Sequence, residues 1–219
     1  MPGKSKTYNF TDRKRSFGNY WRVYSNKVGL ILKLISDREV AHWLLNLEFN
    51  PNVRSFRFDD FNCDPIANET LSKVKYRVLV TLSSGLEYHC ITVSKSRNAE
   101  NNEKLFDAEL WQTKKIRFRH ITDIDLTSRK RQIFPLLKLS AFLTSNKDQY
   151  LPPGVIEAVD TYLKQMRRGS IAKYLSDLPD FGRQVLMLQL FRLYNSGAIA
   201  MGFEETPFKL TTTWELNHG

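Results

Sequence analysis

The sequence predicts a mixed α/β protein built in two parts. In residues 1–148, segments with the alternating pattern of strands occur between segments with the period of amphipathic helices. In residues 150–219, helical segments are followed by a strand hairpin. The polar stretch Ser145–Pro153 separates the two patterns, and its composition is typical of a linker. The 219 residues are enough for one large core or two small ones.

The first helix is predicted from a capping box, Ser36-Asp37-Arg38-Glu39. The Ser36 hydroxyl can accept one free backbone N–H, and the Glu39 carboxylate can reach back to another. Apolar residues at helical spacing follow, namely Val40, Leu44 and Leu47, with Trp43 beside them. The Asn50-Pro51-Asn52 run predicts the end of this helix.

The rest of the first part is predicted to contain four strands and two further helices. The strands are Val53–Phe58, Lys75–Leu82, Glu87–Val93 and Ile116–His120, and the helices are Glu103–Lys114 and Arg129–Leu143. The turn Ser83-Ser84-Gly85 joins the second and third strands into a hairpin, which we expect at the centre of the sheet. An α/β layer of this size matches the core of a restriction-endonuclease-like domain.

The second part has the element order of a winged helix, which is three helices and then a β-hairpin. The predicted helices are Val155–Met166, Ser170–Leu175 and Phe181–Asn195, and the hairpin strands are Ala198–Phe203 and Phe208–Leu216. The third helix ends at Gly197. It carries more apolar residues than one buried stripe needs, so part of it is either a partner surface or a well-covered core face.

The net charge of +10 lies entirely in the first two thirds of the chain. Residues 151–219 hold seven basic and seven acidic side chains and are neutral. A polyanion such as duplex DNA is therefore expected to contact residues 1–150.

Basic and aromatic residues alternate within the first 30 residues. The basic ones are Arg13, Lys14, Arg15, Arg22 and Lys27, and the aromatic ones are Phe17, Tyr20, Trp21 and Tyr24. Two interpretations stay open: a solvated basic arm, or an arm that follows a phosphate backbone and stacks its rings on bases.

The composition argues against membrane and exported classes of protein. No apolar stretch approaches the roughly 20 residues of a transmembrane helix, and the first residues lack the apolar core of a secretory signal. Cys63 and Cys90 cannot make a disulfide framework, and with the four scattered histidines they do not form a zinc pattern. We expect a reducing, cytoplasmic setting and no membrane partner.

The order of several short segments resembles the TnsA family, the endonuclease subunits of heteromeric cut-and-paste transposases. The segments are Arg15-Ser16-Phe17-Gly18, Tyr24-Ser25-Asn26-Lys27, Ser36-Asp37-Arg38-Glu39, Leu47–Phe56, Val78–Gly85 and Ile116–Leu126. The resemblance covers nearly the whole chain. It implies a restriction-endonuclease-like domain over 1–148, a winged-helix domain over 150–219, and a place near the bacterial nucleoid. It also implies three partners: transposon-end duplex DNA, a TnsB-like DDE transposase and a TnsC-like AAA+ regulator.

The resemblance also implies a metal-dependent nuclease centre, from which this sequence departs. The family uses a helix Glu, a strand Asp and an acid-x-Lys pair, whose carboxylates hold magnesium. Here Glu39 matches the Glu and Lys95 matches the Lys, whereas Arg77 and Val93 stand at the two other carboxylate positions. We therefore predict no bound metal and no cofactor, with magnesium relevant only if nuclease activity survives, and we expect Arg77 and Lys95 to bind DNA phosphates.

Three functional hypotheses follow from these observations. The first is a TnsA-like DNA-binding subunit that has lost its nuclease activity. The second is an active magnesium-dependent endonuclease that cuts transposon ends and recruits other acids, which would be Asp59, Asp60, Asp64 or Glu87. The third is a transcription-factor-like winged helix, although its presumed recognition helix offers only Arg183 and Arg192 as basic side chains.

Overall fold

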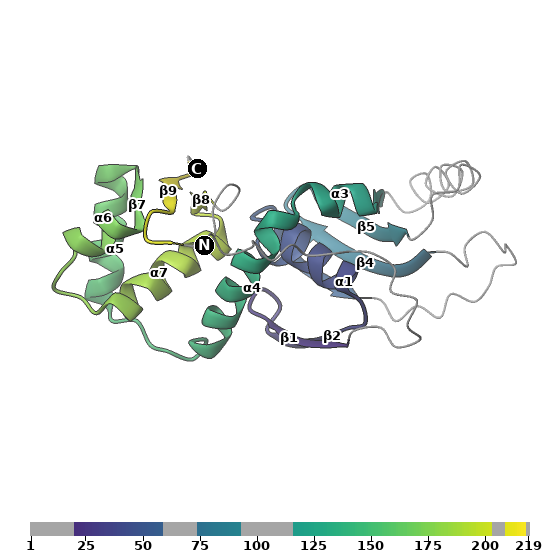
Figure 1. Cartoon of the computed structure of the whole chain (residues 1–219), viewed down its shortest axis with the longest axis horizontal. Helices are drawn as coiled ribbons and strands as arrows, with labels where there is room; N and C mark the ends of the chain where they lie inside the picture. Colours follow the sequence, from purple (N-terminus) through teal and green to yellow (C-terminus); the bar gives the residue numbers. More distant parts are fainter. Residues whose placement is uncertain (1–19, 59–73, 93–115, 203–208, 218–219) are drawn as a thin grey trace, which may run out of the picture.

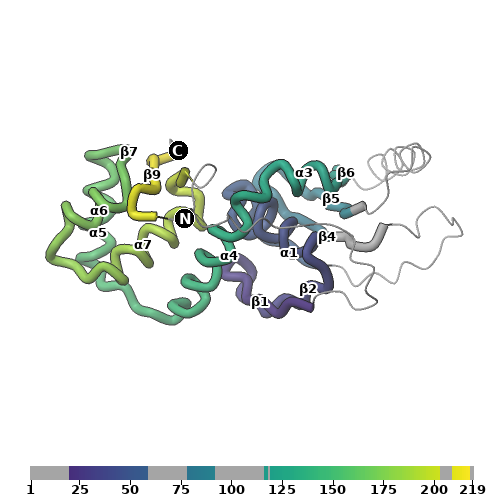
Figure 2. The backbone as a smooth tube through the Cα atoms, in the orientation of Figure 1, coloured from purple at the N-terminus to yellow at the C-terminus, as the bar shows by residue number. Residues whose placement is uncertain are grey.

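A computed structural model describes residues 20–58, 74–92, 116–202 and 209–217. The chain forms two lobes side by side, with one long helix, α4 (Lys130–Ser145), leading from the first to the second (Figure 1). Figure 2 traces the same path through the Cα atoms. The α/β class is confirmed, because the structure combines several sheets with helices. Within the described ranges, no helix is both long and apolar enough to cross a membrane.

The first lobe contains a four-stranded sheet with the predicted hairpin at its centre. The strands are β3 (Val53–Phe58), β4 (Val74–Leu82), β5 (Gly85–Thr92) and β6 (Arg117–Ile121), in the order β3-β4-β5-β6. The first three are antiparallel, and β6 pairs parallel to β5. The connection between β5 and β6, with the helix predicted at 103–114, lies outside the described residues.

The predicted capped helix is confirmed. Helix α1 (Asp37–His42) begins after Ser36, whose hydroxyl accepts the Glu39 backbone N–H at 3.2 Å. The helix continues as a π-helical segment, η1 (Trp43–Glu48), in which every residue is buried. This segment contacts both β3 and α4, so the apolar residues that the sequence places at helical spacing are packed against the core on two sides.

The described part of the basic N-terminal segment is a pair of strands, whereas both interpretations from the sequence took it to be an arm. Strands β1 (Trp21–Ser25) and β2 (Leu30–Leu34) form a separate antiparallel ribbon. The tight turn between them contains Gly29, whose φ of +69° lies in the left-handed region that glycine adopts readily. Residues 1–19, with Arg13, Lys14 and Arg15, lie outside the described part of the chain.

Two helices follow the sheet where the sequence predicted one. Helix α3 (Asp123–Ser128) begins with a capping box between Thr122 and Asp125 and precedes α4. Helix α4 runs from Lys130 without a break at Pro135.

The second lobe has the predicted order of helices and strands, with one short strand added. It comprises α5 (Pro153–Met166), β7 (Arg168–Ser170), α6 (Ile171–Asp177), α7 (Arg183–Ser196), β8 (Ile199–Met201) and β9 (Thr213–Leu216). The strands form their own antiparallel sheet, β7-β9-β8, which contains no strand of the first lobe. Helix α7 ends at Gly197 as predicted, at a φ of +80°.

The two lobes share a continuous apolar core in which α7 is the common member. Helix α7 contacts both α5 and α4. Its Phe191 ring lies perpendicular to Phe142 at 5.3 Å, and its Tyr194 ring stacks on Phe49 at 5.7 Å. Most of the surplus apolar residues of α7 are therefore buried within the chain, as a well-covered core face requires, whereas Met187 and Leu193 are half-buried. The interpretation of part of this helix as a partner surface stays a prediction.

Candidate functional site

Glu39, which matches the family's helix Glu, is buried, and its carboxylate is hydrogen-bonded to the backbone. Only 4% of its surface is exposed, and its carboxylate accepts the backbone N–H of Ile35. Burial raises the pKa of Glu39 to about 7, although hydrogen bonds from the Ile35 and Ser36 backbone oppose that shift. These contacts are those of a helix cap, which was the plain interpretation of the capping box.

The other positions of the expected nuclease centre are only partly described. Arg77 lies in β4 directly opposite Cys90 of β5, and the structure describes its backbone alone. Val93 and Lys95 lie outside the described residues, as do the alternative acids Asp59, Asp60 and Asp64. Among the residues that are described, no three His, Cys, Asp or Glu side chains are grouped so that they could hold a metal ion.

A buried chain of polar side chains, which the sequence analysis missed, joins helix α1 to strand β5. His42 Nε2 lies 3.0 Å from His89 Nδ1, and His89 Nε2 lies 3.0 Å from a carboxylate oxygen of Glu87. Burial lowers the pKa of both histidines, and Glu87 partly offsets this shift for His89. Glu87 is therefore engaged by His89. Because His42 and His89 are 47 residues apart and each sits among apolar neighbours, no local pattern could indicate the pair.

The two described basic residues from the N-terminal segment have different surroundings. Arg22 is exposed on the ribbon, directly opposite Lys33. Lys27 lies in the ribbon turn, where its ammonium donates to the carbonyl oxygens of Leu47 at 2.8 Å and Asn50 at 2.6 Å. Desolvation lowers the pKa of Lys27 to about 8, although nearby Glu48 opposes that shift. Lys27 therefore anchors the ribbon turn to the end of η1.

Glu48 completes this anchor from the helix side. Its carboxylate accepts the backbone N–H groups of Asn26 and Lys27, the Ser25 hydroxyl and the Trp43 indole N–H. Burial raises the pKa of Glu48, and these donors oppose that shift. These protein donors supply the hydrogen bonds that a charged carboxylate needs, so water is not required. The Glu48 side chain thereby fixes the ribbon against the first lobe.

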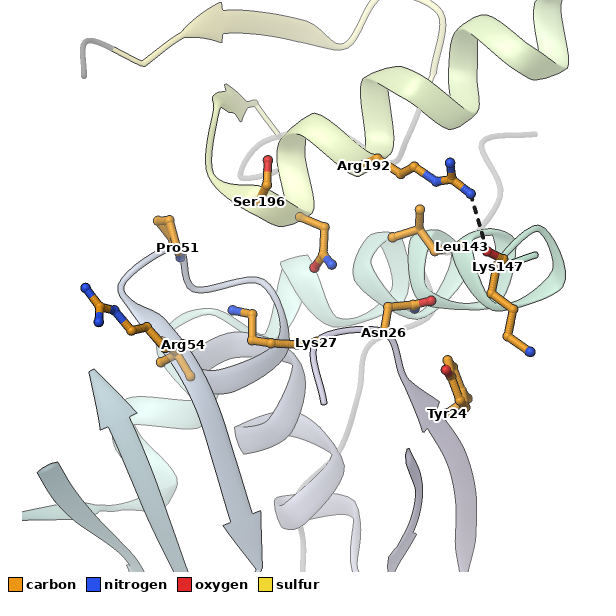
Figure 3. A pocket seen from close by; sticks show the side chains of 11 residues that line it. Tyr24, Asn26, Lys27, Pro51, Arg54, Leu143, Lys147, Arg192 and Ser196 are labelled. Atoms are coloured by element: carbon orange, nitrogen blue, oxygen red, sulfur yellow. Dashed lines mark hydrogen bonds between the residues drawn. The ribbon is translucent and has the colours of Figure 1, made fainter. Parts of the chain in front are cut away.

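A basic cavity of about 560 Å³ lies where the two lobes meet, and we call it the interlobe cleft. Figure 3 shows side chains from the ribbon, from β3, from the end of α4 and from α7 around this space. The polar residues that matter here are Asn26, Lys27, Arg54, Lys147, Arg192 and Asn195. Four of them are cations, and no acidic residue is among the described residues that line the cleft.

The cations of the interlobe cleft differ in how they are held. Arg192 Nη2 donates to the carbonyl oxygens of Asn146 at 3.2 Å and Gln149 at 3.0 Å, which fixes the guanidinium at the end of α4. Lys147 pairs with exposed Asp148 at 2.7 Å and lies over the Tyr24 ring at 5.6 Å. Arg54 is exposed on β3.

No family model matches this chain, and a search of curated proteins finds no significant match.

The sequence analysis did not single out Arg54 or Lys147, and it considered Arg192 only as a recognition-helix residue. These side chains come from β3, the end of α4 and α7. The one available signal was the placement of basic residues beside element ends, such as Arg54 after the Pro51-Asn52 turn. That signal is too common to single out a site.

Proposed function

We propose that this chain is a TnsA-like subunit of a DNA transposition complex that binds duplex DNA and has lost its nuclease activity. The proposal assigns a restriction-endonuclease-like domain to the first lobe and a winged-helix domain to the second. A helix before a sheet of order β3-β4-β5-β6, with only the last strand parallel, supports the first assignment. Three helices with an antiparallel β7-β9-β8 sheet support the second.

The observation that carries the loss of activity is the position of the Glu39 carboxylate. A magnesium ion held by protein needs one or two free carboxylates besides water and phosphate oxygens. Glu39 accepts a backbone hydrogen bond at the start of α1 and has a pKa of about 7, so it is a poor ligand at neutral pH. Arg77 and Val93 supply no carboxylate at the two other family positions. No metal or cofactor is part of this proposal.

DNA binding is supported by exposed basic side chains on the first lobe. They lie on the ribbon and on both edge strands of the sheet, and they are Arg22, Lys33, Arg54, Arg57, Arg117 and Arg119. Side chains of this kind contact phosphates with little dependence on base sequence. Binding should therefore weaken steeply as salt increases.

The proposed protein partners are a TnsB-like DDE transposase and a TnsC-like AAA+ regulator. They come from the resemblance, and most of the apolar residues of α7 that could have supported docking are buried within the chain. Co-purification of the intact chain with each candidate tests this part. Failure of both to bind would remove it without affecting DNA binding.

The central experiment measures DNA binding and cleavage with the same intact protein. We expect a gel-shift titration to detect duplex binding that falls with salt, and no nicking with magnesium or manganese. Nicking that disappears in Glu39→Gln, which keeps the oxygen that accepts the Ile35 N–H, would establish the endonuclease hypothesis instead. Strong preference for one duplex sequence at physiological salt would favour the transcription-factor hypothesis.

A further inference from the structure

We infer that the interlobe cleft is a phosphate clamp, in which groups from both lobes hold one segment of the duplex DNA backbone. This inference rests on the proposed function and adds a site that the resemblance does not assign. The ligand is a phosphodiester of duplex DNA. Three features of the cleft support it: its uncompensated charge, its unpartnered amide atoms, and its rigid walls.

The positive charge of the cleft is contributed by both lobes. Arg54 comes from β3 of the first lobe, and Arg192 comes from α7 of the second. Glu48 lies near Lys27, and Asp148 pairs with Lys147, so those two cations are partly balanced. Within the described ranges, neither Arg54 nor Arg192 has a carboxylate partner. Figure 3 shows the two guanidinium groups at opposite ends of the cleft and pointing away from each other, so each is suited to a different phosphate of one backbone segment.

Two amide side chains line the same cleft with atoms that lack hydrogen-bond partners in the described structure. Asn26 Nδ2 and Asn195 Oδ1 are both buried from solvent and unpartnered. Asn26 lies in the ribbon turn of the first lobe, and Asn195 lies near the end of α7. An unpartnered buried polar atom costs free energy unless a ligand or a water satisfies it. Because both atoms are shielded from solvent, each side chain must turn toward the cleft to reach a phosphate oxygen, and each then offers the two N–H donors of its NH₂ group.

The walls of the cleft are held in place before any ligand binds. The carbonyl oxygens at the end of α4 fix the Arg192 guanidinium, and the ammonium of Lys27 is fixed by Leu47 and Asn50. The lobes also touch directly beside the cleft. A Cβ added to Gly197 would lie 2.2 Å from Cβ of Pro51, so there is no space for the lobes to approach further there. A pre-organised site binds its ligand without paying for closure.

Duplex DNA fits this cleft better than a small free anion does. Arg54 is exposed, and the same strand carries exposed Arg57 farther along. The ribbon turn that supplies Asn26 and Lys27 connects the cleft to exposed Arg22 and Lys33. Basic side chains thus extend from the cleft along the first lobe in two directions, as binding to the regularly spaced phosphates of a DNA backbone requires.

The test is a double-substitution cycle across the cleft in the full-length protein, with a fluorescent duplex as probe. Arg54→Ala and Asn195→Ala are made singly and together. Arg57→Ala on the same strand and Arg183→Ala on the same helix as Asn195 are the matched controls, because neither lines the cleft. Thermal unfolding of each variant checks that the fold is retained.

We expect each cleft substitution to weaken duplex affinity by about ten-fold, as for a lost hydrogen bond to a charged group. The Arg54→Ala change should also reduce the slope of log affinity against log salt by about one unit. Because the inference has both residues hold one backbone segment between the lobes, the double variant should lose less than the product of the single losses. The control pair should show independent, multiplicative effects.

Other outcomes separate this inference from the proposed function. If the wild-type protein fails to bind duplex DNA, the proposed function is wrong. If it binds but the double cleft variant shows independent, multiplicative losses like the control pair, the clamp is wrong and DNA binding stands. Inorganic phosphate that raises the unfolding temperature of the wild type but not of Arg54→Ala, with duplex affinity unchanged in that variant, would make the cleft a free-anion site and overturn the inference.

Discussion

His42 Nε2 lies 3.0 Å from Nδ1 of His89, and the far nitrogen of His89 lies 3.0 Å from Glu87. This geometry determines which ring nitrogens of the two histidines carry a proton. Glu87 accepts from Nε2–H of a neutral His89, so Nδ1 of His89 accepts from Nε2–H of His42. His42 Nδ1 is then left as an unprotonated acceptor, and it has no partner among the described residues. These hydrogen bonds join α1 to the sheet, and this arrangement of protons requires both imidazoles to be neutral.

The first prediction concerns acid stability. Burial holds the pKa of His42 well below its usual value of 6.5, so the unfolded state binds a proton there that the folded state does not. The neutral His42 side chain therefore contributes fully to the free energy of unfolding above pH 6.5, and this contribution is lost as pH falls below 6.5. Urea unfolding at pH 7.5 and 5.5 should show that His42→Gln reduces this acid loss by about 1 kcal/mol. An equal acid loss in the wild type and in His42→Gln would contradict this assignment.

The second prediction concerns Glu39 and has the opposite sign. Its folded pKa of about 7 exceeds the unfolded value of 4.5. The contribution of protonated Glu39 to the free energy of unfolding is therefore fully present below pH 4.5 and is lost as pH rises through about 7. Glu39→Gln stays neutral and keeps an acceptor for the Ile35 N–H. We expect this variant to lose less stability than the wild type between pH 5 and 8, by on the order of 1 kcal/mol. Parallel stability curves for the two proteins would show that the carboxylate does not titrate in this range.

The third prediction concerns the contact between the lobes. Gly197 has a φ of +80°, and an added Cβ would meet Pro51 at 2.2 Å. Gly197→Ala should therefore destabilise the protein by at least about 2 kcal/mol, from the left-handed conformation and the clash together. Gly154→Ala is the matched control, because nothing lies within 4 Å of its added Cβ. Denaturant unfolding that gives equal midpoints for the two variants would mean that the lobes do not press on each other here.

The sequence predicted the elements whose signals are local. The Ser36 cap, the central hairpin and the glycine that ends α7 each depend on a few consecutive residues, and all three are present in the structure. The Glu39 carboxylate, however, accepts the N–H of Ile35, one residue before the cap. The ribbon was missed because its basic and aromatic residues suggested an arm, whereas its inward face packs Trp21 and Val23 on the core.

Contacts between distant segments could not be predicted in the same way. Phe142 packs perpendicular to Phe191, and this pairing accounts for one of the apolar residues of α7 that looked surplus in the sequence. The interlobe cleft likewise combines Arg54 with Arg192, which no spacing rule connects. The expected nuclease centre stays a prediction at Arg77, Val93 and Lys95, and at Glu39 the structure agrees with the capping role.

The last prediction separates two basic residues that the sequence treated alike. Arg22 is exposed on the ribbon, whereas the ammonium of Lys27 donates to two backbone carbonyls at the end of η1. We expect Arg22→Ala to leave the free energy of unfolding within about 0.5 kcal/mol of the wild type, as surface changes usually do. The same change should weaken duplex binding and reduce its salt slope by about one unit, because a phosphate contact is lost.

Lys27→Met, in contrast, removes the donor from two carbonyls and keeps the length of the side chain. We expect it to cost about 1–3 kcal/mol of stability, because buried acceptors lose a charged partner and Glu48 loses a nearby cation. Denaturant unfolding and gel-shift titration in a salt series measure both quantities for both variants. If Lys27→Met proves as stable as Arg22→Ala, the ribbon turn is not anchored through its ammonium. If both variants lower the salt slope equally while both stay folded, Lys27 contacts DNA directly, and its role is the one that the sequence first indicated.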